Sequence, residues 1–209
     1  MRLSNQLVIA TANKDKFDEF KALFGAYPEV KPISAADLIR NPSKLGTVEV
    51  FSTYEENATA KARLANQACH FPVLADDSGL EVDALGGKPG VRSHRFAPRS
   101  QTLTQDEANV QHLLKEIGKG PRTARFVCTL VLLIEGLKLQ SSGILEGNLT
   151  EVPRGTNGFG YDPVFIPKGS TKTLAEMTDG EKNTISHRAK ALHDLMSQIK
   201  NHGIILAKP

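Results

Sequence analysis

At 209 residues, the chain is long enough for one compact domain or for two closely associated lobes. Its apolar content of 40% and charged content of 23% are ordinary for a globular protein, and a net charge of +3, spread evenly, argues against a nucleic-acid-binding surface. No run of about 18 apolar residues is present, so we expect no membrane span. The N-terminus lacks the long apolar region of a signal peptide, so we expect a cytoplasmic protein.

The first elements along the chain are a short strand, a polar turn and a helix. Residues 7–10 form an apolar run that is typical of a buried strand, and the turn at residues 11–13 follows it. The apolar face of the next helix carries Phe17, Phe20, Leu23 and Phe24. A helix start directly after a strand presents backbone N–H groups to an anion. Lys14 and Lys16 lie at this start, where cations are unfavourable unless something negative binds.

A second helix is predicted from residue 54 to residue 69, because its alanines have high helix propensity. The next apolar run, residues 71–75, predicts a buried strand that ends abruptly at two carboxylates, Asp76 and Asp77.

Residues 104–117 predict a third helix, which Thr104 and Glu107 would open with a capping box. Residues 122–149 then read as antiparallel strands joined by a two-residue turn at Glu135 and Gly136. The two cysteines, Cys69 and Cys128, have neither a metal-binding nor a disulfide-framework spacing, so we expect buried, reduced thiols.

The last part of the chain predicts a glycine-aromatic loop, GTNGFGYDPVFIP at residues 155–167, and a long amphipathic helix. The apolar stripe of this helix comprises Ile185, Leu192, Leu195, Met196 and Ile199. With Ser186 as the N-cap, His187 and Arg188 would place two potential cations in the first turn, against the helix dipole. Such rule-breaking is expected at functional sites. Helices mixed with parallel and antiparallel strands indicate an α/β protein with a mixed sheet.

The Asp76–Asp77 pair is the strongest chemical signal in the sequence. Adjacent residues of a strand point to opposite sides of the sheet, so the two carboxylates are not expected to share a proton. A hard cation is a better reason for acidic groups here, because Mg²⁺ binds one or two carboxylates together with phosphate oxygens. Glu56 is a natural second ligand. The alternative is that both aspartates simply form a turn after the strand.

Two further sets of residues have both a functional and a structural interpretation. Five lysines could each be a solvated surface charge, or together they could line a polyphosphate pocket. These are Lys14, Lys16, Lys61, Lys88 and Lys182. In residues 158–163, Phe159 could stack on a planar base, or Phe159 and Tyr161 could fill the core. No P-loop and no GxGxxG fingerprint is present. The residues alone therefore indicate Mg²⁺-dependent phosphate chemistry on a ligand that contains a ring.

Five segments, in this order, resemble the inosine/xanthosine triphosphate pyrophosphatases, which hydrolyse deaminated purine nucleoside triphosphates to the monophosphate and pyrophosphate. The segments are TANKDK (residues 11–16), YEENATAKA (54–62), ADDSGLEVDALGGKPG (75–90), GFGYDPVF (158–165) and EKNTISHR (181–188). One such motif would be weak, but the set in register is specific. The resemblance implies a single domain over residues 1–209, with an elongated central mixed sheet, helices on both sides and two lobes flanking a substrate cleft. It also implies a homodimer.

The resemblance also assigns roles to residues at the matching positions. Triphosphate would be bound by Thr11, Ala12, Asn13, Lys14, Asp15 and Lys16. Glu56 and Asp77 would hold Mg²⁺, and Asp77 would accept a proton from the attacking water. Lys61 and Ser78 would contact phosphate. The base would be framed by Phe159, Gly160, Tyr161 and Asp162, and its pocket completed by Lys182, His187 and Arg188. Asp76 would support Asp77 without binding the metal itself.

Base discrimination follows from hydrogen-bond chemistry. Hypoxanthine and xanthine present an acceptor oxygen at position 6, where adenine presents a donor amine, so a donor-only guanidinium such as Arg188 would favour the former.

The sequence departs from the family pattern at three places. Ala12 replaces the usual Gly, Asn157 stands where Gly is common and could adopt the left-handed conformation, and His94 replaces a small residue in the loop at residues 92–100. Two alternatives stay open. One is the septum-formation type of pyrophosphatase, which acts on pyrimidine or modified triphosphates, and the other is a nucleotide-binding module without catalysis.

Overall fold

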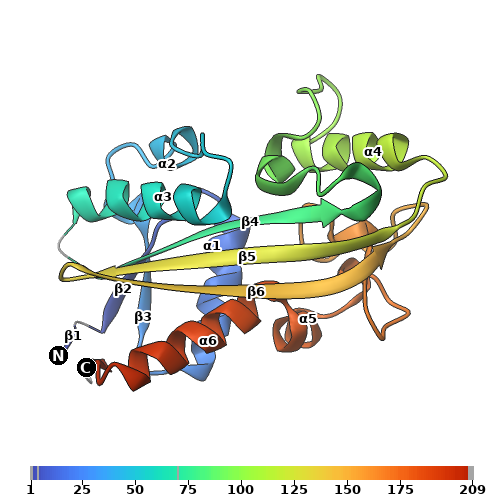
Figure 1. The fold of residues 1–209 in the computed structure, drawn as a ribbon. Coiled ribbons are helices and arrows are strands. Elements are labelled where there is room, and N and C mark those ends of the chain that lie inside the picture. The colour runs from blue at the N-terminus through green and yellow to red at the C-terminus, as the bar shows by residue number, and fades with distance from the viewer. Residues whose placement is uncertain (1, 4, 70, 207–209) are drawn as a thin grey trace. The chain divides into compact units, whose positions relative to one another are not determined.

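The computed structural model describes residues 2–3, 5–69 and 71–206 (Figure 1). Its strands are β1 (Arg2–Leu3), β2 (Gln6–Ile9), β3 (Lys31–Ser34), β4 (Val73–Val82), β5 (Thr123–Ile134), β6 (Leu137–Leu149), β7 (Phe165–Pro167) and β8 (Ile205–Leu206). Its α-helices are α1 (Lys14–Leu23), α2 (Lys44–Thr47), α3 (Tyr54–Ala68), α4 (Gln105–Ile117), α5 (Asp179–Ile185) and α6 (His187–Asn201). Short 3₁₀ helices span Phe24–Ala26, Ala35–Asp37, Asp83–Leu85, Gly90–Arg95, Asp162–Val164 and Leu174–Glu176.

The strands form a mixed sheet, as the sequence predicted. Its order is β3-β2-β4-β5-β6-β7, and a separate pair joins β1 to β8. Strand β2 runs parallel to both β3 and β4, whereas β6 and β7 are antiparallel. Glu135 (φ 43°) and Gly136 (φ 86°) form the predicted two-residue turn between β5 and β6, and paired positive φ values are typical of tight hairpins.

The chain divides into two compact units, which we describe separately. Unit 1 comprises residues 1–77, 128–143 and 188–209, and unit 2 comprises residues 78–127 and 144–187. Each unit takes part of β4, β5 and β6.

In unit 1, helices cover both faces of the sheet (Figure 1). Side chains alternate along each strand, so Ile9 and Leu74 join one core cluster while Val8 and Val73 join the other. The first cluster includes apolar residues of α1 and α6, and the second includes Leu45 of α2 and the buried alanines of α3, Ala58, Ala62 and Ala65. The expectation of helices on both sides of the sheet is therefore confirmed for this unit.

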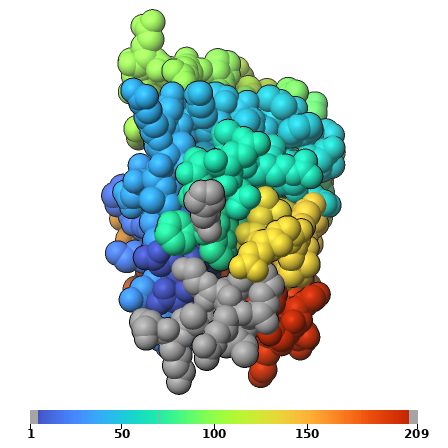
Figure 2. Space-filling model, turned by 90° about the vertical axis from the view of Figure 1, so that its left-hand side faces the viewer, coloured from blue at the N-terminus to red at the C-terminus, as the bar shows by residue number. Residues whose placement is uncertain are grey.

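Near its turn, the β5–β6 hairpin contacts α3 on one side and α6 on the other (Figure 2). Lys138 Nζ lies 2.8 Å from Glu55 Oε1 of α3, and Gln198 of α6 donates a hydrogen bond to the carbonyl of Gln140 at 2.8 Å. These contacts hold the end of the hairpin between α3 and α6, which cover opposite faces of the sheet.

Unit 2 has one core cluster, which combines apolar residues of α4 with those of the strands and of the glycine-aromatic loop. The rings of Phe126 and Phe165 pack at 4.7 Å between centroids. The capping box predicted for Thr104 and Glu107 is present at the start of α4.

Two boundaries predicted from the sequence are wrong. Strand β4 does not end at Asp76 but continues to Val82, because both aspartates find polar partners on their own faces of the sheet. Ile185 is the last residue of α5, not part of the stripe of α6, since α6 begins at His187 after the extended Ser186 (φ −61°, ψ 153°). The strands β3 and β7 and the helix α2 were not predicted, because each is too short to show a periodic pattern.

Both cysteines are buried and neither forms a disulfide, as expected. Among the described residues, no helix combines the length and the apolar character that crossing a membrane requires.

Candidate functional site

The aspartate pair lies in the middle of β4, with one carboxylate on each face of the sheet. Asp76 follows Leu74 on the face covered by α1 and α6, and Asp77 follows Ala75 on the face covered by α3. Asp76 is 1% exposed and Asp77 is 4% exposed. Burying two charges within one strand requires compensating groups on both faces, and the turn interpretation of this pair is excluded by the continuous strand.

The Asp76 carboxylate is surrounded by cations. Lys16 Nζ of α1 lies 2.8 Å from Asp76 Oδ2, and Arg188 Nε at the start of α6 lies 3.8 Å from the same atom. Arg188 also donates a hydrogen bond to Glu19 of α1 at 3.2 Å. Burial alone would raise the pKa of Asp76, but Lys16, Lys61 and Arg188 outweigh it and hold that pKa well below its usual range. Asp76 is therefore ionised at neutral pH and orders Lys16 and Arg188.

The Asp77 carboxylate has weaker compensation. Asn57 Nδ2 of α3 donates to Asp77 Oδ2 at 2.9 Å, and Lys61 Nζ lies 3.8 Å from Asp77 Oδ1. Lys61 is closer to a second carboxylate, Glu49, with which it forms a partly buried ion pair. Burial raises the pKa of Asp77 to about 6, and Glu49 adds to this rise while Lys61 and Lys16 oppose it. A carboxylate with this pKa can accept a proton near neutral pH.

The turn before α1 brings only part of the TANKDK segment to this cluster. Thr11 is buried, and its hydroxyl oxygen accepts a hydrogen bond from the Asn13 N–H at 3.1 Å. Asn13 caps α1 by accepting from the Lys16 N–H at 3.0 Å. Ala12, Lys14 and Asp15 are exposed, and the Lys14 ammonium contacts Asp18 on the helix surface.

Glu49 is a site residue that the sequence did not indicate. It stands in an irregular segment with no motif around it, and only the contact with Lys61 twelve residues later reveals it. The residue named from sequence, Glu56, is exposed, and its carboxylate accepts a hydrogen bond from the Thr53 hydroxyl at 2.6 Å in the cap of α3. The predicted role of Glu56 stays a prediction beside this second carboxylate.

In unit 2, the glycine-aromatic loop is organised around Asp162. Lys182 Nζ of α5 donates to Asp162 Oδ2 at 2.7 Å, and the same oxygen accepts from the Phe159 N–H at 3.1 Å. The Lys182 ammonium also lies 4.8 Å from the centroid of the Phe159 ring, a cation–π contact. A Cβ added to Gly158 (φ +72°) would lie 2.1 Å from Asp162 Oδ2. The loop therefore closes tightly on this ion pair and holds Phe159 half-buried.

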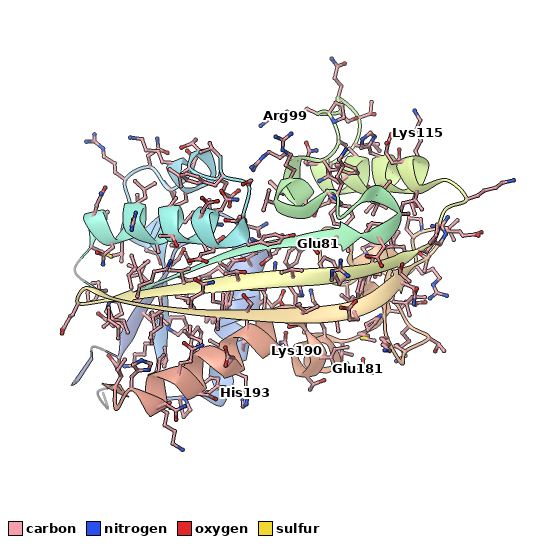
Figure 3. All side chains as sticks on the ribbon, viewed as in Figure 1. Glu81, Arg99, Lys115, Glu181, Lys190 and His193 are labelled. Carbon is pink, nitrogen blue, oxygen red and sulfur yellow. The ribbon has the colours of Figure 1, made fainter. Side chains whose placement is uncertain are left out.

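The second side of the same loop faces α4. The Gly160 N–H donates to Asp106 Oδ2 at 2.8 Å, and a pocket of about 420 Å³ opens between Asp106 and residues 156–160. Neighbouring residues of α5 differ in exposure. Lys182 is buried, whereas Glu181 is exposed (Figure 3) and pairs with the exposed Lys172.

The remaining predicted residues of unit 2 are Tyr161, His187 and Ser78, and the first two are buried. Tyr161 belongs to the core, and its hydroxyl donates to the carbonyl of Ser93 at 2.8 Å, so the core interpretation is right for this residue. His187 is buried and stacks on Phe126 at 4.8 Å with an interplanar angle of 11°. Ser78 is half-buried in β4.

The departures from the family pattern are accommodated locally. In this loop the positive φ values fall on Gly155, Gly158 and Gly160 rather than on Asn157, whose side chain instead donates to the carbonyl of Met177 at 2.9 Å. His94 is exposed, and its carbonyl accepts a hydrogen bond from Asn109 at 3.1 Å. Lys88 is exposed, in agreement with the surface interpretation.

The donors around Asp77 fit a magnesium ion. Within the described residues, no group of three or more His, Cys, Asp or Glu side chains is arranged to hold a metal. Mg²⁺ needs only one or two protein carboxylates when phosphate oxygens complete its shell. The Asp77 carboxylate is buried, and the Lys61 ammonium that pairs with Glu49 stays 3.8 Å from it, so its charge is incompletely compensated. A cation beside these oxygens would supply the missing positive charge.

Comparisons with known proteins agree on one family. A sequence model of the Ham1 family matches residues 7–198. The dITP/XTP pyrophosphatase of Bacillus licheniformis is 45% identical over 194 residues, which cover 91% of this chain and 95% of that protein. The dITP/XTP pyrophosphatase of Bacillus subtilis is 42% identical over 200 residues, covering 93% and 97%. Among solved structures, the Ham1 protein of Staphylococcus aureus matches with a TM-score of 0.77 and 35% identity, covering 94% of this chain and 99% of that one.

We predict that the same substitution at the two adjacent aspartates changes stability in opposite directions. The folded pKa of Asp77, about 6, lies above its usual 3.8, so its ionisation costs the fold up to about 3 kcal/mol, a cost absent below pH 3.8 and complete above pH 6. Asp77→Asn should therefore raise stability at pH 7.5. Asp76→Asn should lower it by about 3–5 kcal/mol, because Lys16 and Arg188 lose a buried partner.

Urea unfolding at pH 7.5 with EDTA measures both changes, and each variant is the control for the other. At pH 4, where Asp77 is protonated when folded, the gain from Asp77→Asn should shrink towards zero. Destabilisation by Asp77→Asn at pH 7.5 would contradict this account of the site.

Proposed function

The chain belongs to the Ham1 family, and from this premise we propose that it is a nucleoside-triphosphate pyrophosphatase that hydrolyses deaminated purine nucleotides. Its substrates would be ITP, dITP and XTP, and its products the nucleoside monophosphate and pyrophosphate. The observation that carries this proposal is the buried Asp77 carboxylate, which accepts a hydrogen bond from Asn57 and lies 3.8 Å from the Lys61 ammonium, with Lys16 paired to the adjacent Asp76. The names of the relatives, dITP/XTP pyrophosphatases at 42–45% identity, support the choice of substrate.

Unit 1 would handle the triphosphate. The ammonium groups of Lys16 and Lys61 are held in place by Asp76 and Glu49, so they can spread the charge of the phosphate oxygens without reorganising. Thr11 and the start of α1 would add neutral donors to the phosphate site. Asp77 would accept the proton of the water whose oxygen attacks phosphorus, as the P–O bond that joins the α- and β-phosphates breaks and pyrophosphate leaves.

Mg²⁺ would be held by Asp77 with a second carboxylate, for which Glu49 and Glu56 are the candidates. When bound, the ion would offset the negative charge of the phosphate oxygens. Lys61 stands between Asp77 and Glu49 and would keep the two carboxylates from repelling each other.

Unit 2 would bind the base. Phe159 is fixed at its backbone by Asp162 and at its ring by Lys182, which leaves a half-buried aromatic face for stacking. By family resemblance, Arg188 would add donors to the 6-oxygen of the base.

Removal of such nucleotides would prevent their incorporation into DNA and RNA. A homodimer is part of the proposal on grounds of family resemblance alone, and a cytoplasmic location stays part of the proposal as well.

Pyrophosphate release from a panel of ITP, dITP, XTP, ATP, GTP, CTP and dTTP with Mg²⁺ tests the reaction. We expect fast release from the first three nucleotides and a loss of at least about a hundredfold in Asp77→Asn, because general-base catalysis contributes about 10²–10⁴-fold. Preference for CTP or dTTP would indicate the septum-formation type of enzyme. Nucleotide binding without any release would leave the non-catalytic module.

The second metal carboxylate is identified by a matched pair of variants. Because Glu49 contacts Lys61 beside Asp77 and Glu56 caps its own helix, Glu49→Gln should raise the Mg²⁺ concentration for half-maximal rate by about tenfold or more. Glu56→Gln should change it by less than about threefold. The reverse order of the two effects would restore Glu56 as the ligand.

The role of Arg188 is tested by selectivity, not by rate alone. Arg188→Ala should lower the ratio of kcat/KM for ITP over ATP, since the donor for the 6-oxygen is gone. Arg188→Lys keeps a cation beside Glu19 and Asp76 but lacks the planar guanidinium group. A loss of selectivity in this variant would therefore come from altered base recognition and not from the loss of the buried charge. An unchanged ITP-to-ATP ratio in both variants would refute this role.

A further inference from the structure

Asn57 is a completely buried amide in the first turn of α3, and no step of the proposed reaction uses it. It stands one turn before Lys61 on the same face of the helix. A buried Asn must satisfy both its oxygen and its NH₂ group, so the partners of this side chain show what its position requires.

The amide joins Asp77 to the segment that precedes α3. Its Nδ2 donates to Asp77 Oδ2 at 2.9 Å. Its Oδ1 accepts from the Phe51 N–H at 3.0 Å, and Nδ2 also approaches the Phe51 carbonyl at 3.4 Å. One side chain therefore connects a carboxylate of the central sheet to both backbone groups of a residue in the preceding loop.

This loop carries Glu49 two residues before Phe51. Apolar burial contributes little to its position, because Val50 is 76% exposed and Phe51 is 44% exposed. Glu49 itself is tied to Lys61, which also lies 3.8 Å from Asp77. The polar contacts of Asn57 and Lys61 thus hold the loop against α3. Lys61 contacts a side chain of the loop, whereas Asn57 contacts the loop's backbone.

We propose that Asn57 is a positioning residue that sets the separation of the Asp77 and Glu49 carboxylates and thereby the affinity of this site for a divalent cation. The inference rests on the proposed function for its biological meaning. Partners that orient the ligands of a metal typically change its affinity by about 10–100-fold when they are removed. An amide that only filled space would leave that affinity unchanged.

Direct binding of Mn²⁺ alone, followed by the EPR signal of the free ion, tests the inference without nucleotide. Asn57→Ala should raise the Kd for Mn²⁺ by about tenfold or more. It should also raise the Mg²⁺ concentration for half-maximal pyrophosphate release, with much of the rate recovered at saturating Mg²⁺. Asn57→Ser serves if the alanine variant does not fold, because a hydroxyl is too short to contact both Phe51 and Asp77.

Asn109 provides the matched control. It is also a buried helical amide that bridges to a loop: its Oδ1 accepts from the Ala97 N–H at 2.8 Å, and its Nδ2 donates to the His94 carbonyl at 3.1 Å. No carboxylate is among these partners. Asn109→Ala should therefore lower the melting temperature to a similar degree, measured in EDTA, and leave the Kd for Mn²⁺ unchanged.

Three outcomes would overturn the inference: Mn²⁺ affinity within twofold of the wild type in Asn57→Ala, an equal loss in Asn109→Ala, or no Mn²⁺ binding by the wild type. Failure of the proposed function has a different signature. In that case the wild type releases no pyrophosphate from any nucleotide, while the loss of Mn²⁺ affinity in Asn57→Ala persists and still supports the positioning role.

Discussion

The arrangement of unit 1 depends on the burial of two neighbouring carboxylates in the middle of one strand. Strand alternation sends Asp76 and Asp77 to opposite faces, so each makes its direct contacts with a different set of helices. Asp76 receives Lys16 of α1 and Arg188 of α6, and the hydrogen bond from Arg188 to Glu19 ties these two helices together. Asp77 receives Asn57 and Lys61 of α3.

The two faces are not compensated equally, and this inequality matters for chemistry. Asp76 is held ionised by cations, whereas Asp77 keeps a pKa of about 6 because burial outweighs its partners. A group that the fold leaves under-compensated is able to gain from a cation or a proton. At Asp76 the ionised form stabilises the fold, whereas at Asp77 the ionised form, which the proposed reaction would use, costs the fold stability.

Much of the fold could be predicted from sequence because long elements carry strong periodic patterns. The helices α1, α3 and α4 begin within a residue of their predicted starts, since Asn13, Thr53 and Thr104 are N-caps. The end of β4 was misjudged because the sequence does not show that Lys16 and Asn57 would accompany the aspartates into the sheet.

The candidate site was recoverable where motifs are contiguous and not where contacts are distant. Residues 159–162 and Lys182 were named together, and Lys182 does contact Asp162. Glu49 and Asn57 were missed for a physical reason: Glu49 stands in a segment without regular structure, and Asn57 resembles any polar residue of a helix start. Their significance comes from the partners that folding gives them, Lys61 and Asp77.

Gly158 illustrates how exposure and tolerance to mutation can separate. The residue is exposed, which ordinarily permits almost any side chain. Yet the smallest side chain would collide with the carboxylate of Asp162, and its backbone conformation is one that other residues rarely adopt. Any replacement would push Asp162 away from Lys182 and release the Phe159 backbone. In evolutionary terms, Gly158 is as restricted as a packed core residue although it lies on the surface. We expect it to be replaced only when Asp162 or Lys182 is replaced as well.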